Sequence, residues 1–156
     1  MMLQFCLVLL ALALGSQGSL SPSTVTPAGC LTDLDKNRLS TQAGIEKRIR
    51  ICQEISDQFR KAVEQAAKKQ MTEGVSVLLA CWSDHLAASL KDIDANINRK
   101  KRSGALKDFE IQLRKSIRDM ENARLKAPYQ ESSHYDPWLD QANMVRKKFV
   151  DILFQR

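Results

Sequence analysis

Hydrophobic residues recur at steps of three and four along most of the chain beyond residue 44. This spacing collects them on one face of an α-helix, because 3.6 residues complete a helical turn. The pattern predicts four amphipathic helical segments. Their apolar stripes run from Ile45 to Ala66, from Leu78 to Ile97, from Leu106 to Leu125 and from Leu139 to Leu153. We therefore expect an all-α fold.

Local signals mark several ends of these segments. Ser103 precedes the third stripe and is expected to cap its helix, and Ala127-Pro128 is expected to end that helix. Asp136-Pro137 combines a capping carboxylate with a proline suited to the first helical position, so the fourth helix should begin there. Thr32 or Ser40 is expected to cap the first helix. Residues 129–135 are then the longest expected internal loop.

Between the first two stripes, the pattern loosens from Met71 to Gly74. We favour a reversal of the chain near Gly74, because one helix of about 55 residues would be long for a globular domain. A continuous helix is the alternative, since a single glycine costs a helix only about 1 kcal/mol relative to alanine. The expected architecture is an up-and-down antiparallel bundle of about four helices, or of three if one is long, spanning residues 32–156.

The first residues of the chain form an unbroken apolar run from Phe5 to Leu14, followed by the small residues of a cleavage site. This is typical of a secretory signal peptide, with cleavage expected between Gly18 and Ser19. The run is too short for a membrane span, which needs roughly 20 residues, although residues 1–18 lack the usual lysine or arginine. We expect a secreted or periplasmic protein whose residues 19–31, rich in serine, threonine and proline, form a flexible segment.

The formal net charge is +6, and its densest part is the run Arg99, Lys100, Lys101 and Arg102. Three interpretations apply to this basic patch. Cations are favoured at a helix C-terminus by the helix dipole. They also attract phosphate, lipid headgroups or acidic polymers. Finally, the pattern resembles a proprotein-convertase site with cleavage after Arg102. Because the chain is expected to be exported, we expect a protein or anionic surface as its partner rather than nucleic acid, with no membrane span after cleavage.

Removal of the leader would take Cys6 away and leave Cys30, Cys52 and Cys81. An oxidising compartment then permits one disulfide. If the chain reverses at Gly74, Cys81 faces residues near position 67 and Cys52 lies roughly 20 Å further along, which is beyond the reach of a disulfide. The candidate bonds therefore join Cys30 to Cys52 or Cys30 to Cys81.

Cys81, Asp84 and His85 are spaced three and four apart and share a helical face. With one further ligand, this set could hold zinc or copper. A structural role is the stronger interpretation, because Cys81 lies on the apolar flank beside Trp82. A nucleophilic pair of Cys81 and His85 would need a third orienting group, which the sequence does not identify. His134, in the expected loop 129–135, could line a small binding site.

The sequence contains no dinucleotide fingerprint, phosphate-binding loop, nucleophile elbow or metalloprotease helix motif. It therefore predicts no catalytic residue and no cofactor. The function it favours is that of an exported, non-enzymatic helical protein that binds a macromolecular partner or an anionic envelope surface. One alternative is a secreted helical signalling ligand processed after Arg102, and another is a metal- or thiol-dependent site at Cys81, Asp84 and His85.

Overall fold

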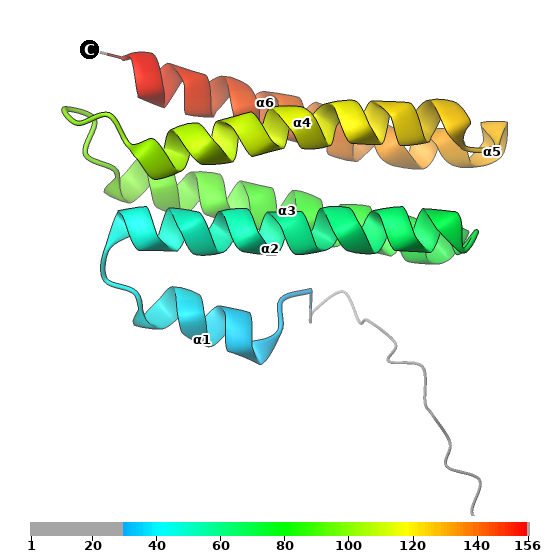
Figure 1. Ribbon diagram of the computed structural model, residues 1–156, viewed down its shortest axis with the longest axis horizontal. Helices are drawn as coiled ribbons and strands as arrows, with labels where there is room; N and C mark the ends of the chain where they lie inside the picture. The colour runs from blue at the N-terminus through cyan, green and yellow to red at the C-terminus, as the bar shows by residue number, and fades with distance from the viewer. Residues whose placement is uncertain (1–29, 156) are drawn as a thin grey trace, which may run out of the picture.

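The computed structural model describes residues 30–155, which form helices joined by short connections and contain no strand. The prediction of an all-α fold is confirmed. Four long helices lie side by side, with a shorter helix beside them (Figure 1). The predicted leader, its cleavage site and residues 19–29 lie outside the described residues. The helical elements are α1 (Asp33–Thr41), α2 (Ile45–Lys68), α3 (Thr72–Asn96), α4 (Gly104–Lys126), α5 (Tyr129–Ser132), the 3-10 turn η2 (Ser133–Tyr135) and α6 (Asp136–Phe154).

Consecutive long helices run in opposite directions along the bundle. Some helices that are adjacent in space are nevertheless parallel, because they are not consecutive in the chain. α2 packs against α3 and α4, and α6 packs against the same two helices. Gln112 donates to the Gln53 carbonyl and the Ala105 amide to the Glu46 carboxylate, both across 59 residues, so α2 and α4 run parallel. The connection between α3 and α4 therefore crosses a diagonal of the bundle, and its seven residues, 97–103, are long enough to do so.

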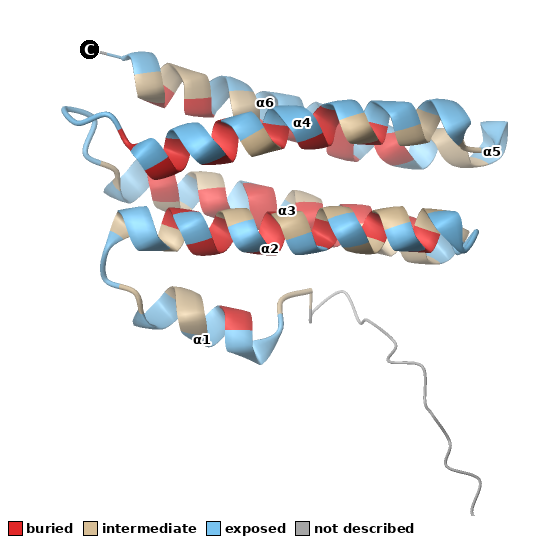
Figure 2. Ribbon diagram, viewed as in Figure 1, coloured by how far each residue is buried: buried red, intermediate tan, exposed pale blue. Residues whose placement is uncertain are grey.

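Apolar side chains from all four long helices fill the core. Buried positions alternate with exposed ones along each long helix (Figure 2). The stripes predicted for α2, α4 and α6 are mostly buried, although Ile45 and Leu153 at their ends are half-buried and Leu125 is 76% exposed. Trp82 of α3 packs against Trp138 of α6, with ring centroids 4.2 Å apart. On the other side of the core, Phe109 of α4 packs against Phe149 of α6.

The chain reverses between α2 and α3, but three to five residues before the predicted position. α2 ends in a Schellman motif, in which the amide of Gln70 donates to the Ala67 carbonyl and the amide of Met71 to the Ala66 carbonyl. Gln70 takes the left-handed conformation, with φ at 56°, that glycine usually supplies. Gly74 instead lies in the first turn of α3, so its choice as the turning point was wrong.

Two other local predictions were also wrong. Residues 129–135 are not a loop but α5 and η2. Asp136 is the first residue of α6 rather than its side-chain cap, and its carboxylate accepts from Arg124 at 2.7 Å. The chain is already helical when it reaches Asp136, so no extended capping residue is needed. In contrast, Ser103 caps α4 as predicted, because its hydroxyl accepts from the Leu106 amide at 3.0 Å.

The short helix α1 was not predicted, because it has almost no apolar face and only Asp35 in it is buried. Thr32, expected at the start of the first long helix, caps α1 instead by accepting from the Asp35 amide. Polar contacts hold α1 beside α2, including the salt bridge from Arg38 to Glu54. Ser40 lies inside α1, so α2 begins at Ile45 without a side-chain cap.

Candidate partner-binding surface

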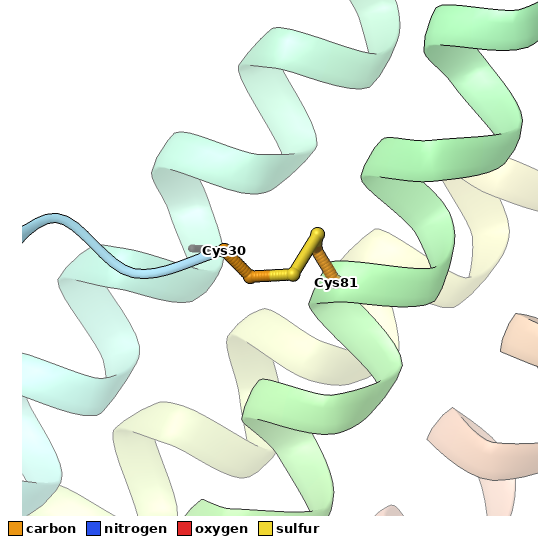
Figure 3. Close-up of a disulfide and its surroundings, with 2 residues drawn as sticks. All are labelled: Cys30 and Cys81. Atoms are coloured by element: carbon orange, nitrogen blue, oxygen red, sulfur yellow. A yellow bond between two sulfur atoms is a disulfide. The ribbon is translucent and has the colours of Figure 1, made fainter. Parts of the chain in front are cut away.

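Cys30 and Cys81 form a disulfide, one of the two pairings that the sequence allowed (Figure 3). It ties the segment before α1 to the middle of α3. Since Trp82 donates to Ser56, position 81 lies opposite residues near 57 rather than 67. Cys52 is therefore only about five residues, or roughly 8 Å, further along α2. The predicted offset of roughly 20 Å was too large, because the turn lies before Gly74.

Cys52 and His85 face the interior between α2 and α3. The Nε2 of His85 donates to the Cys52 carbonyl at 2.9 Å, and burial lowers the pKa of His85. Burial likewise raises the pKa of the Cys52 thiol, so this cysteine is protonated near neutral pH and a poor nucleophile. Both side chains are therefore buried parts of the α2–α3 interface, and neither is placed to react with a molecule in solvent.

The proposed metal ligands are not brought together. The Cys81 sulfur is bonded to Cys30, the His85 side chain is buried and Asp84 is exposed on the outside of α3. Within residues 30–155, no three side chains of the types that ligate metals form a group able to hold an ion. The three residues do lie on neighbouring positions of α3, as their spacing predicts. However, Cys81 and His85 point into the core, whereas Asp84 points to solvent.

The basic patch Arg99–Arg102 lies in the exposed connection between α3 and α4, not in the last turn of α3 as its helix-dipole interpretation required. Arg99 is fixed in place, because its guanidinium donates to the Asp94 carboxylate and to Gln155. In the described part of the chain, Lys100, Lys101 and Arg102 form no ion pair, so three adjacent positive charges face solvent unpaired.

The end of α6 lies beside this patch. Residues 152–155 and the four basic residues line one open hollow of about 1000 Å³. Phe154 in this hollow is 69% exposed, although phenylalanine is among the most buried residue types. We call the four basic residues together with Phe154 and Gln155 the basic end of the bundle.

The opposite end of the bundle has a different charge balance. An open hollow of about 870 Å³ lies there, lined by apolar residues such as Met71, Val75 and Ala123. Three lysines and three acidic residues surround it, so its formal charges cancel: Lys68, Lys115, Lys126, Glu64, Asp119 and Glu131. His134, which was expected to line a small site, and Tyr135 also border this hollow. We call it the neutral end.

Sequence reasoning identified the basic patch but missed the residues beside it. Phe154 lies two positions after the buried Ile152, which places it about 200° around α6, on the polar face. The sequence alone therefore indicated that Phe154 would be an exposed aromatic residue. Its proximity to residue 99 could not be read from the sequence, because it depends on the diagonal course of the α3–α4 connection.

Comparison of the chain with family models, curated proteins and solved structures gave no match. In the residues that the structure describes, no helix is both long and apolar enough to cross a membrane. The assignment of function therefore depends on the surface chemistry of the chain itself.

Proposed function

We propose that this chain is an exported, non-enzymatic helical protein that binds an anionic envelope surface or an anionic macromolecule through its basic end. The observation that carries the proposal is the group of three exposed cations, Lys100, Lys101 and Arg102, without an ionic partner in the described residues. Each unpaired cation close to an anionic surface contributes about 1 kcal/mol of attraction.

Two further features support this proposal. The Cys30–Cys81 disulfide suits an oxidising compartment, as the signal peptide predicts. The side chains most capable of chemistry, Cys81 and His85, are already engaged inside the bundle, one in the disulfide and the other with the Cys52 carbonyl. A binding role on the surface is therefore better supported than a reaction in the interior.

Equilibrium binding tests the proposal directly. The oxidised protein beginning at Ser19 is titrated with dextran sulfate and with equimolar phosphatidylcholine and phosphatidylglycerol vesicles. We expect it to bind at least one of these probes, and we expect the affinity to fall as salt is added, because exposed charges are screened. No binding to either probe at low salt would contradict the proposal.

The same residues support a second candidate function, that of a secreted ligand processed after Arg102. The observation in its favour is that Arg99–Arg102 lie in an exposed connection outside the helices, where a protease can reach them. The disulfide joins two cysteines that both precede this site, so cleavage would leave residues 103–156 without a covalent link to the rest. Intact-mass measurement of the natively exported protein tests this, because a single uncut chain would contradict it.

A further inference from the structure

We propose that the anionic partner of the basic end is a lipid bilayer, and that Phe154 inserts into its interface while the neighbouring cations contact the headgroups. This inference rests on the proposed function and names the partner of the same surface. It follows from the combination of an exposed aromatic side chain and unpaired cations in one hollow.

The ring of Phe154 is exposed at the basic end. It projects from the last turn of α6 and remains 69% exposed, whereas Phe149, one and a half turns earlier, is fully buried. A soluble polyanion offers charge but nothing into which an aromatic ring can be buried. A bilayer interface offers both, and aromatic side chains are enriched at this depth.

A side-chain hydrogen bond joins the α3–α4 connection to the end of α6 beside the ring. Arg99 donates to Gln155 at 2.6 Å, which links the α3–α4 connection to the residue after Phe154. Arg99 also forms a salt bridge with Asp94 at the end of α3. The ring and the three unpaired cations are therefore held on one end of the bundle, and a flat anionic surface can contact them together.

The acidic side chains near the basic end determine how much of its positive charge is cancelled. The acidic residue in contact with the basic patch is Asp94, and Arg99 already pairs with it. Glu46, Asp92, Asp108 and Asp151 are further acidic groups in the helix turns nearest this end. The Ala105 amide engages Glu46, and the Arg48 guanidinium pairs with Asp92. The three unpaired cations therefore dominate the field at the basic end, and the bundle would stand on the bilayer with the neutral end pointing away.

Tryptophan fluorescence tests the insertion. Trp82 and Trp138 are at most 1% exposed, so membrane binding should leave their emission unchanged. In a Phe154→Trp variant, we expect a blue shift when equimolar phosphatidylcholine and phosphatidylglycerol vesicles are added, and no shift with phosphatidylcholine alone. Leu125→Trp is the matched control, because Leu125 is 76% exposed on α4 away from the basic end, and it should show no shift.

A second variant measures the contribution of the ring to binding. Phe154→Ala should lower the affinity for anionic vesicles about tenfold, since burial of an exposed phenylalanine is favourable. It should leave the affinity for dextran sulfate unchanged, because a soluble polyanion does not bury the ring.

The outcomes separate this inference from the function on which it rests. Binding to dextran sulfate without binding to vesicles would overturn the bilayer as partner and leave the proposed function standing. Vesicle binding with no shift in Phe154→Trp, or with no loss in Phe154→Ala, would overturn the insertion. Binding to neither probe by the unsubstituted protein would overturn both proposals.

Discussion

Polar side chains are hydrogen-bonded in the interior of the bundle but exposed to solvent at its basic end. Between α2 and α3, Trp82 donates to Ser56 and His85 to the Cys52 carbonyl, so these polar groups stabilise the fold. At the basic end, three adjacent cations face solvent without an ionic partner among residues 30–155 and bring no comparable stabilisation. If the basic end binds the partner as proposed, stability and binding depend on different parts of the molecule, and substitutions should affect them separately.

The largest effect on stability should follow removal of the disulfide. A Cys30→Ser/Cys81→Ser variant loses a cross-link that closes a loop across 51 residues, and the chain-entropy estimate for this loop is about 4 kcal/mol of unfolding free energy. Urea denaturation measures this change, and reduction of the unsubstituted protein serves as an independent control. A loss below about 1 kcal/mol would contradict the stabilising role of the disulfide. Weaker dextran sulfate binding by the folded variant would contradict the separation of binding from stability.

A smaller loss should follow the substitution Ser56→Ala. It leaves the buried indole N–H of Trp82 without an acceptor, which costs about 1–3 kcal/mol. Ser116→Ala is the matched control, because Ser116 is equally buried but its hydroxyl has no hydrogen-bond partner in the part of the chain that the structure describes. Thermal and urea denaturation should show a loss for the first variant and little change or a gain for the second. Equal losses would show that the Trp82 hydrogen bond is not the cause.

Acidification tests the buried histidine. Burial lowers the folded-state pKa of His85 below its unfolded value of about 6.5, so the unfolded state binds more protons between these two values. Stability should therefore fall as the pH drops below about 6.5, by at most about 1.4 kcal/mol per pH unit, until the lowered pKa is passed. Urea denaturation from about pH 7 to about pH 5.5 measures the slope, above the range of ordinary carboxylates.

Two variants assign this slope to one histidine. His85→Gln should flatten it, although this variant also changes a buried contact and is therefore compared only for its pH dependence. His134→Gln should retain the slope, because His134 is exposed. A slope that survives His85→Gln would contradict the assignment.

The smallest effect on stability is expected at the basic end. A Lys100→Gln/Lys101→Gln/Arg102→Gln variant removes exposed, unpaired charges, so its unfolding free energy should stay within about 0.5 kcal/mol of the original. Urea denaturation checks this. A destabilisation of 1 kcal/mol or more, as an order of magnitude, would mean that the cations support the fold after all.

Much of the fold was readable from the chain because apolar periodicity determines which faces are buried. The stripe of α2 was predicted closely, and Ser103 was recognised as the cap of α4. The turn at Gln70 was not readable, because glutamine rarely takes the left-handed conformation and Gly74 offered a more usual candidate. The preference of glycine for turns therefore pointed to Gly74 rather than to Gln70.

The candidate site was only half readable. The cations of Arg99–Arg102 are adjacent in the chain, so their density was evident from the sequence. Their position beside Phe154 depends on the diagonal connection between α3 and α4, which follows from the packing of all four long helices. Local pattern carries no information about such a contact. The spacing of Cys81 and His85 also suggested chemistry, but burial and the disulfide give both a structural role.

We propose that the three adjacent cations of the basic end, whose hollow is lined by no acidic residue within the described range 30–155, govern binding, rather than the net charge of +6. Two variants with the same net charge separate these possibilities: the triple glutamine variant of the basic end and Lys68→Gln/Lys115→Gln/Lys126→Gln at the neutral end. The measurement is the affinity of each for the anionic probe that the unsubstituted protein binds, at low salt. The basic-end variant should lose about 100-fold and the neutral-end variant less than about threefold. Equal losses would contradict the claim.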